Sequence, residues 1–480
     1  MRQELAEVRA HFHQQQEFAA KLELELTKAR QRIMELEAQL KSNSQNSSKP
    51  PSADPPGAPA RPKGKKSKRK RGGQPGHQAH FSPVPEHVDQ VHEHRATACE
   101  RCDATLCGGE ETEVGAPHYV YELPEIRPIV HKHVCLGITC VACGWRTEAV
   151  LPPGIPAGQY DPSVQGMVGV LRGELKQSVR QSSAVMTHIL HVPMSTGMVS
   201  KTQRQVSGAL AAPFEEAHQY AKEQERANAD ESSWREDKKK AWLWVCVTGL
   251  VTVFLIRASR GAQAAKDLLG EAWRGILITD RWASYNWVTA TQRQLCWSHL
   301  KRDFKGFLDY GADAKRLGEQ LLCQTRRMFR LWHRVRDGTL SREDLQAKMK
   351  PVRRQIEALL EEGRGLDSCT KVSGMCKEIL KLRQALFTFV DMEHVEPTNN
   401  AAERALRFAV LWRKGCFGSD TAGGSRFVER FLTVRATLRR QNRDLYSYLK
   451  AACTASLQGT RAPSLLPPCT QTASAALAAA

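Results

Sequence analysis

One segment near the middle of the chain alternates between strand-like and helix-like patterns, and this restricts the fold more than any other part. The pattern predicts three consecutive strands, a crossover helix and a further strand, at residues 227–235, 240–247, 250–256, 262–271 and 275–279. We expect the last strand to pair with the first. The segment therefore predicts a mixed sheet with helices on its faces, within a multidomain α+β protein.

Three acidic residues lie in or beside these elements. Asp280 ends an apolar run that is typical of a buried strand, Asp230 lies at the start of the hairpin-like stretch, and Glu403 lies on a helix predicted over 398–414. Carboxylates at strand ends and on a facing helix can converge on two divalent ions about 3.5–4 Å apart. Each acid also has an ordinary interpretation, because either aspartate could form a turn or cap a helix and Glu403 could pair with Arg407.

The overall charge favours an anionic partner. The 480 residues include 70 Lys and Arg against 51 Asp and Glu, a net charge of +19. Nucleic acid is the commonest partner of so basic a protein, although a solvated basic surface is the alternative. The most apolar stretch, 241–256, is shorter than the roughly 20 residues of a membrane span, so a buried hairpin is expected. With no signal peptide expected and cysteine usage typical of free thiols, we predict a cytoplasmic protein.

The first 41 residues carry a heptad repeat that predicts a coiled coil. A helix with this a/d spacing needs a partner helix, and self-association is the simplest choice, while docking on the same chain is the alternative. The apolar positions of the repeat are Leu5, Val8, Phe12, Ala19, Leu22, Leu26, Ala29, Ile33, Leu36 and Leu40.

Residues 42–82 predict a disordered basic linker. Ser, Asn and Pro dominate its first part, and a basic run follows that contains no acidic residue. Such a run would bind phosphates without sequence preference, or would merely improve solubility. Its candidate DNA-binding residues are Lys65, Lys66, Lys68, Arg69, Lys70 and Arg71.

Residues 83–152 predict a zinc-binding module. Two Cys-x-x-Cys pairs, Cys99 with Cys102 and Cys140 with Cys143, provide four thiolates for one tetrahedral structural zinc ion. The span between the pairs is longer than in the common pattern, and strands could fill it. Cys107, His133 and Cys135 are alternate ligands.

Three further regions are predicted from helical periodicity and composition. Residues 153–225 form a helical domain that resembles a helix-turn-helix, although any all-helical domain contains such a turn, so plain packing is favoured. Residues 300–395 predict charged helices, and 451–480 predict a C-terminal tail.

Basic and amide side chains accompany Glu403. Asn399 and Arg407 lie four residues before and after it, so all three are expected to share one helical face that could bind a phosphate. The other DNA-binding candidates of this region are Arg302, Arg404, Arg413 and Lys414. His299 and Arg302 are further candidates for supporting the acids, although a packed histidine is equally expected.

Several sequence blocks, taken in their order along the chain, resemble the insertion-sequence-66 transposases. The match covers most of the chain, from the heptad to about residue 450. They are Asn-Ser-Ser-Lys-Pro-Pro-Ser (46–52), Gly-Gly-Gln-Pro-Gly-His (72–77), the two Cys-x-x-Cys pairs, Asp-Glu-Ser (230–232), Thr-Asp-Arg followed by Tyr (279–285), Cys-Trp-Ser-His-Leu-Lys-Arg-Asp-Phe (296–304), Asn-Asn-Ala-Ala-Glu-Arg-Ala-Leu-Arg (399–407) and Arg-Lys-Gly-Cys-Phe-Gly-Ser (413–419).

The resemblance implies a bacterial mobile-element enzyme with a ribonuclease-H-like core formed by 226–299 and 396–450, interrupted by the helical insertion 300–395. It implies a DDE triad on Asp230, Asp280 and Glu403, two Mg²⁺ ions that Mn²⁺ can replace, and zinc on the four cysteines. It also implies DNA as partner, at the element's ends and at the target, with accessory proteins of the same element as further candidate partners. Ser232 stands where similar proteins often have Thr.

Two alternatives remain open at the level of sequence. A ribonuclease-H-like nuclease would cut DNA without joining it. A zinc-dependent DNA-binding regulator would need only the coiled coil, the linker and the cysteines, and it would leave the three acids without a purpose.

Overall fold

A computed structural model of the protein describes residues 2–43, 46–47, 84–108 and 115–467. Contacts divide the chain into two units, one formed by Met1–Ala58 with Ile129–Ala480 and the other by Pro59–Pro128. The basic run with Lys65, Lys66, Lys68, Arg69, Lys70 and Arg71 lies outside the described residues.

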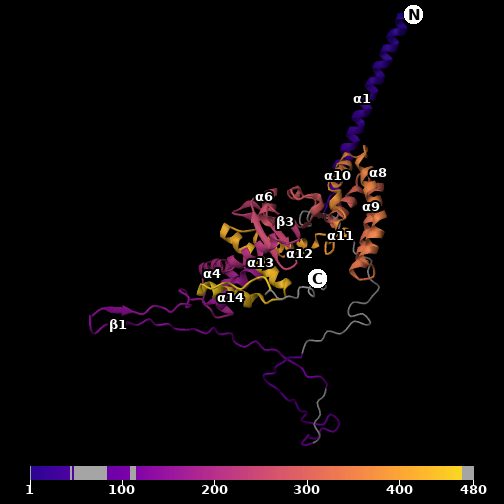
Figure 1. The fold of residues 1–480 in the computed structure, drawn as a ribbon. Coiled ribbons are helices and arrows are strands. Elements are labelled where there is room, and N and C mark those ends of the chain that lie inside the picture. Colours follow the sequence, from indigo (N-terminus) through magenta and orange to yellow (C-terminus); the bar gives the residue numbers. More distant parts are fainter. Residues whose placement is uncertain (1, 44–45, 48–83, 109–114, 468–480) are drawn as a thin grey trace. The chain divides into compact units, whose positions relative to one another are not determined.

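A five-stranded mixed sheet, in the order β5-β4-β3-β6-β7, lies in the larger unit (Figure 1). Its strands are β3 (Arg226–Glu236), β4 (Lys239–Val247), β5 (Thr252–Arg257), β6 (Ile276–Thr279) and β7 (Arg293–Leu295). The first three strands are antiparallel neighbours, and β6 runs parallel to both β3 and β7. The predicted pairing of β6 with the first strand is therefore confirmed, whereas β7 was not predicted.

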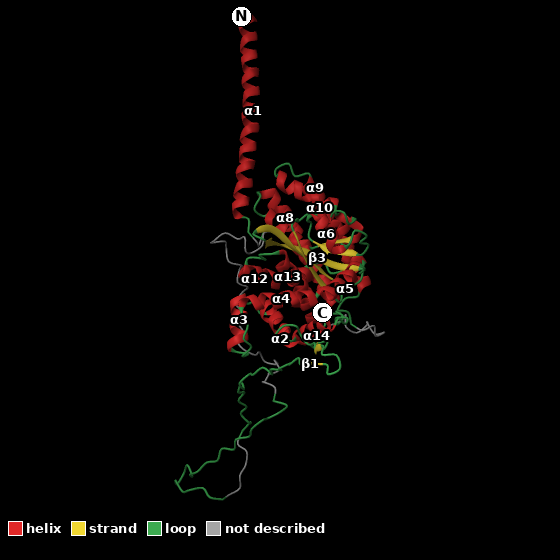
Figure 2. Cartoon of the chain, turned by 90° about the vertical axis from the view of Figure 1, so that its left-hand side faces the viewer, coloured by secondary structure: helices red, strands yellow, loops and turns green. Residues whose placement is uncertain are grey.

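Helices pack against this sheet (Figure 2). They are α5 (Ala211–Lys222), α6 (Ala262–Leu269), α12 (Asn400–Cys416) and α13 (Ala422–Arg440). One apolar core joins them to the strands and includes Trp244, Phe254 and Phe431, all at most 1% exposed. The free edge of β5 is covered, because its backbone N–H groups at Thr252 and Phe254 donate to the hydroxyls of Thr437 and Thr433 on α13.

The region 300–395 is helical, as predicted, but it shares a core with the sheet. Its helices are α7 (Trp297–Phe307), α8 (Ala312–Arg336), α9 (Arg342–Arg364), α10 (Thr370–Lys381) and α11 (Thr388–Asp391). Ile276 and Ile278 of β6 belong to the same apolar cluster as these helices. The strand that precedes Asp280 is therefore supported from the helical region by burial of apolar surface.

The helices that precede the sheet pack with the last helix of the chain. They are α2 (Pro162–Gly169), α3 (Val179–His188) and α4 (Thr196–Ala209), with a π-helical turn at Val170–Glu174 after α2. The last helix is α14 (Leu445–Gln458), and it contacts α2 and α4. The tail predicted from residue 451 therefore begins later than expected, because α14 continues to Gln458 and Leu465 beyond it is fully buried.

The N-terminal helix and a small hairpin complete the larger unit. The helix α1 spans Arg2–Lys41, and the hairpin is formed by β1 (Gly137–Thr139) and β2 (Arg146–Glu148). Heptad positions of α1 such as Phe12 and Leu22 are exposed by 60% and 55%, so the coiled-coil partner stays a prediction. Among the described residues, no helix combines the length and apolarity that a bilayer span requires.

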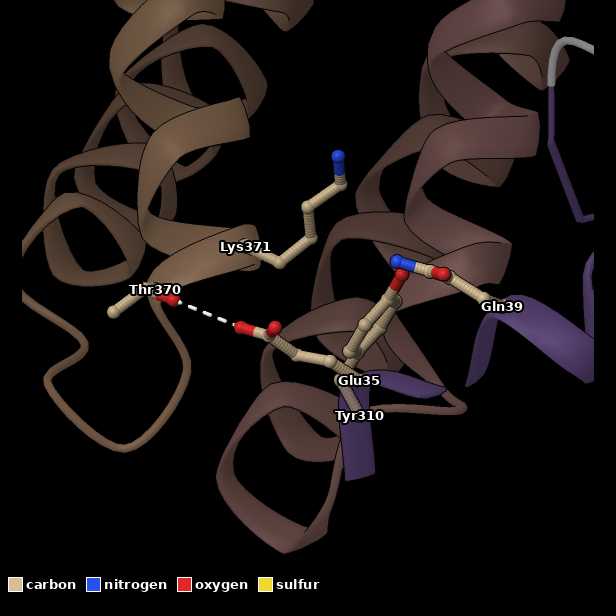
Figure 3. A pocket seen from close by; sticks show the side chains of 5 residues that line it. All are labelled: Glu35, Gln39, Tyr310, Thr370 and Lys371. Carbon is tan, nitrogen blue, oxygen red and sulfur yellow. Dashed lines mark hydrogen bonds between the residues drawn. The ribbon is translucent and has the colours of Figure 1, made fainter. Parts of the chain in front are cut away.

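The C-terminal end of α1 contacts the helical region beside α10 (Figure 3). The Glu35 carboxylate accepts a hydrogen bond of 3.1 Å from the Thr370 hydroxyl, and a cavity of about 300 Å³ is lined there by Glu35, Gln39, Tyr310, Thr370 and Lys371. In the part of α1 whose side chains are described, contacts with the rest of the chain are therefore found at its C-terminal end. Docking of α1 on its own chain is observed there.

Candidate active site

The two aspartates come level with each other at the ends of neighbouring strands. Asn228 lies opposite Ile278 in the parallel pairing of β3 and β6, so two residues further along Asp230 is level with Asp280. The same reasoning applies to β6 and β7, where Thr279 lies opposite Leu295 and the next residues are Asp280 and Cys296. Register therefore places Asp230, Asp280 and Cys296 in a row across three adjacent strands, which we call the strand-end row.

A buried arginine holds the backbone of Asp280 in this row. Arg293 on β7 is fully buried, and its guanidinium donates to the Asp280 carbonyl and to the Thr279 hydroxyl, each at 3.1 Å. Burial is the main cause that lowers the pKa of Arg293 to about 10, which still leaves it charged at neutral pH. This cation therefore fixes the end of β6 from inside the protein.

Asn399, immediately before α12, ties that helix to the row. Its side-chain amide donates to the Ala229 carbonyl at 2.7 Å and accepts from Asn228 at 3.0 Å, and its backbone N–H donates to the Cys296 sulfur at 3.2 Å. These bonds hold the first turn of α12, which carries Glu403, over β3 and the end of β7. The Asn399 side chain is fully buried and its hydrogen bonds are used inside the protein, while its predicted contact with DNA stays a prediction.

The three predicted carboxylates are close enough to affect one another electrostatically. Burial is the main cause that raises the pKa of Asp230 well above its ordinary value. The negative charges of Glu231, Asp280 and Glu403 raise it further. For Glu403, burial again raises the pKa, Arg302 opposes the shift and Asp280 adds to it. The site therefore concentrates negative charge that a bound cation would relieve.

Glu231, the acid beside Asp230, has a different role. It is buried, and its carboxylate accepts hydrogen bonds from Arg260 at 2.8 Å and from the Tyr285 hydroxyl at 2.7 Å. Alternation along β3 turns it to the face opposite Asp230. Asp237 is exposed in the turn between β3 and β4. Glu231 is thus used in buried hydrogen bonds and Asp237 lies in an exposed turn, so Asp230 is the acid of β3 that faces Asp280.

Glu403 has an oxygen with no hydrogen-bond partner in the described structure. Its Oε1 atom is buried, and so is the equally unpartnered Nδ1 atom of His299 on α7. These two atoms are 3.6 Å apart, and the Arg302 guanidinium is also 3.6 Å from Glu403 Oε1. A buried carboxylate oxygen that accepts no hydrogen bond, near other carboxylates, is suited to coordinate a divalent cation.

Cys296 and His299 form a second candidate metal grouping with Glu403. Their potential ligand atoms all lie within 4.8 Å of one another. Burial raises the pKa of Cys296 to about 11 and lowers the pKa of His299 to about 4, so both are neutral near pH 7. The sequence did not single out Cys296 as a ligand, because the three residues before it, Arg293-Gln294-Leu295, show no strand-like apolar pattern.

The predicted DNA-binding residues of α12 are divided between surface and interior. Arg404, Arg407 and Lys414 are exposed. Arg413 is half-buried and donates to the Ser232 hydroxyl at 3.1 Å, so it also holds α12 against β3. Arg302 is half-buried beside Glu403. The exposed cations are available to a polyanion, whereas Arg413 and Arg302 have partners within the protein.

The two Cys-x-x-Cys pairs each form a tight turn, one in each unit of the chain. Asp103 N–H donates to the Cys99 carbonyl at 2.9 Å, and Gly144 N–H donates to the Cys140 carbonyl at 2.8 Å. Backbone N–H groups lower the pKa of the Cys99 thiol and of the Cys140 thiol, which favours thiolates, the form that binds zinc. One turn brings Cys99 and Cys102 together and the other brings Cys140 and Cys143 together, so each turn can provide two zinc ligands. The shared site stays a prediction.

Comparison with known proteins adds independent information. An uncharacterized protein of Sinorhizobium fredii, y4qI, is 25% identical over 267 residues, which cover 50% of this chain and 49% of that protein. The chain thus spans about half the length of this relative. Residues 1–83 match a protein family of unknown function. Residues 158–426, more than half of the chain, match the model of the IS66 transposase family, and this stretch contains Asp230, Asp280 and Glu403. The chain therefore belongs to the IS66 family of transposases.

Proposed function

We propose that this protein is the DNA transposase of a bacterial insertion sequence, acting in the cytoplasm on nucleoid DNA. The observation that carries the proposal is the strand-end row, with Glu403 held over it by the hydrogen bonds of Asn399. Family membership supports a transposase role for these residues. The sheet order, with one strand parallel to the first of three antiparallel strands, supports a ribonuclease-H-like core.

Asp230, Asp280 and Glu403 would together hold two Mg²⁺ ions, for which Mn²⁺ can substitute. Their donor atoms are carboxylate oxygens, which hard divalent cations prefer, and the Glu403 oxygen that accepts no hydrogen bond fits this role. When bound, such ions supply an activated water and stabilise a leaving oxygen in phosphoryl transfer.

The chain's own residues position the DNA. Arg404 and Arg407 are exposed on α12 near Glu403 and hold backbone phosphates. Arg302 lies beside Glu403 and contributes a positive charge at the site itself. In cleavage, water attacks the phosphodiester at the element's end and releases a 3′-OH. In strand transfer, that 3′-OH attacks target DNA, so one phosphodiester bond breaks as another forms.

The remaining regions serve assembly. The exposed heptad of α1 pairs with a second copy of the chain, and the four cysteines hold one structural zinc ion. The basic run at 61–71 adds non-specific affinity for DNA. Accessory proteins of the same element are further partners.

The test is cleavage of a duplex that carries the terminal sequence of the protein's own element. Asp280→Asn should abolish Mg²⁺-dependent nicking while the protein still retards the duplex in a gel. An Asp280→Ala protein that nicks the end like wild type would overturn the proposal. Precleaved ends separate the transposase from a nuclease, because only the transposase joins them to target DNA.

A further inference from the structure

Trp282 is an exposed aromatic residue next to the carboxylates. It follows Asp280 by two residues, and its backbone N–H donates to the Asp280 carboxylate at 2.9 Å. Its side chain is 39% exposed, whereas Trp234, Trp244 and Trp297 of the same region are at most 1% exposed. An aromatic ring that is partly open to solvent beside the carboxylates is available to stack on a base.

The Trp282 indole is held in a fixed position. Its ring N–H donates to the Arg260 carbonyl at 3.2 Å, and the Arg260 guanidinium lies 3.7 Å from the ring centroid. The same guanidinium lies 4.8 Å from the ring of Trp242. We call Trp242, Arg260 and Trp282 the stacked group.

A buried ion pair anchors the stacked group to the sheet. Arg260 contacts the Glu231 carboxylate at 2.6 Å, and that carboxylate also accepts the Tyr285 hydroxyl. Because Glu231 adjoins Asp230 on β3, the ion pair ties the stacked group to the strand that carries Asp230. An exposed ring that is already immobilised loses little conformational entropy on binding.

We propose that Trp282, backed by Arg260, forms a stacking site for an unpaired base of the DNA end that lies in the active site. Aromatic rings bind bases through their faces, whatever the base, and a nearby guanidinium favours the nucleic acid's negative charge. A base in an intact duplex is already stacked on its neighbours, so the site selects a frayed or unpaired nucleotide. This inference rests on the proposed function, because it assumes that DNA occupies the site.

The probe is a forked duplex that carries 2-aminopurine in its unpaired arm, with the fully paired duplex as reference. Binding is measured in Ca²⁺, which avoids cleavage, by fluorescence titration of the full-length protein. Wild type should quench the 2-aminopurine and prefer the forked duplex by about 10-fold. Trp282→Leu should lose both the quenching and the preference while its affinity for the paired duplex is unchanged. Trp282→Phe should retain most of both.

The control is Leu250→Ala, a similarly exposed apolar residue in the turn between β4 and β5, which should behave like wild type. Thermal unfolding of each variant shows whether the fold survives. The inference is overturned if Trp282→Leu quenches and prefers the fork as wild type does, or if it weakens both duplexes equally, as a purely structural arginine–tryptophan contact would. A wild-type protein that binds neither duplex and does not cut its end DNA would instead defeat the proposed function.

Discussion

The strand-end row and the two cysteine turns are both candidate metal sites, but they are built in opposite ways. Each cysteine turn joins residues three apart through local backbone hydrogen bonds, such as that from Gly144 to Cys140. The row brings together residues from separate strands, and Glu403 reaches it only because Asn399 bonds to β3. A local turn holds its two cysteines together whatever surrounds it. The strand-end row forms only when the strands pair in the observed register, and Glu403 joins it only when α12 is bound to β3.

The largest expected effect separates the two sites by function. Asp280→Asn should lower Mg²⁺-dependent end cleavage by more than about 100-fold, because loss of a direct ligand should exceed the 10–100-fold cost of losing a supporting residue. The zinc content of the same protein should not change. If cleavage falls and zinc is lost together, the two sites are not independent and the comparison fails.

The reciprocal change is Cys140→Ser. Wild type should carry about one zinc per chain by elemental analysis, and the variant should lose it because a hydroxyl is a poor zinc ligand. Unfolding of the sheet-containing core should stay within error, since Cys140 is exposed and outside its apolar clusters. Cys323→Ser, at another exposed cysteine, is the matched control and should retain the metal. Full zinc content in Cys140→Ser would refute the ligand assignment.

Stability against pH sharpens the description of the row. The pKa of Asp230 is raised in the folded protein above its ordinary value of 3.8, chiefly by burial, so the folded state holds this proton more tightly than the unfolded chain. The stability linked to Asp230 is therefore present at low pH and is lost as the pH rises from about 3.8 through the raised pKa.

Asp230→Asn removes this loss, so without metal the variant should unfold at a higher temperature than wild type at pH 8, and the difference should shrink toward pH 4. Adding Mg²⁺ at about 100 times its Kd should stabilise wild type by about 2.7 kcal/mol and the variant by less. If pH and Mg²⁺ change the unfolding temperature of both proteins equally, Asp230 does not contribute a negative charge to the strand-end row.

The smallest expected effect concerns the link between α12 and the sheet. Asn399→Ala should cost about 1–3 kcal/mol of unfolding free energy, because Asn228 and the Ala229 carbonyl lose a buried hydrogen-bond partner. Cleavage by the folded fraction should also fall, since Glu403 follows in the first turn of the same helix. Asn400→Ala, at the exposed neighbouring residue of α12, is the matched control. Denaturant unfolding measures the stability of both variants. A loss of cleavage without any loss of stability would point to direct contact with DNA.

Much of the core could be predicted because its elements have clear local patterns. The strands β4, β5 and β6 follow from apolar runs separated by turn residues, and α6 follows from its helical pattern. In β3, small and polar residues alternate over 227–230. The strand β7 was missed because three residues carry no periodicity, and it contains the buried Arg293. Helical spacing predicted a face shared by Asn399 and Glu403, but it could not show that the Asn399 side chain bonds to β3.

The sequence by itself determined most of the elements, the basic character of the chain and the two cysteine pairs, because these depend on residue type and on neighbours a few positions away. Only the tertiary structure decided that Asp230 faces the row while Glu231 turns inward to Arg260, and that Asn399 holds α12 in place. The physical reason is that strand register and burial arise from contacts between distant segments. A one-residue change in register would exchange the two acids between the faces of β3.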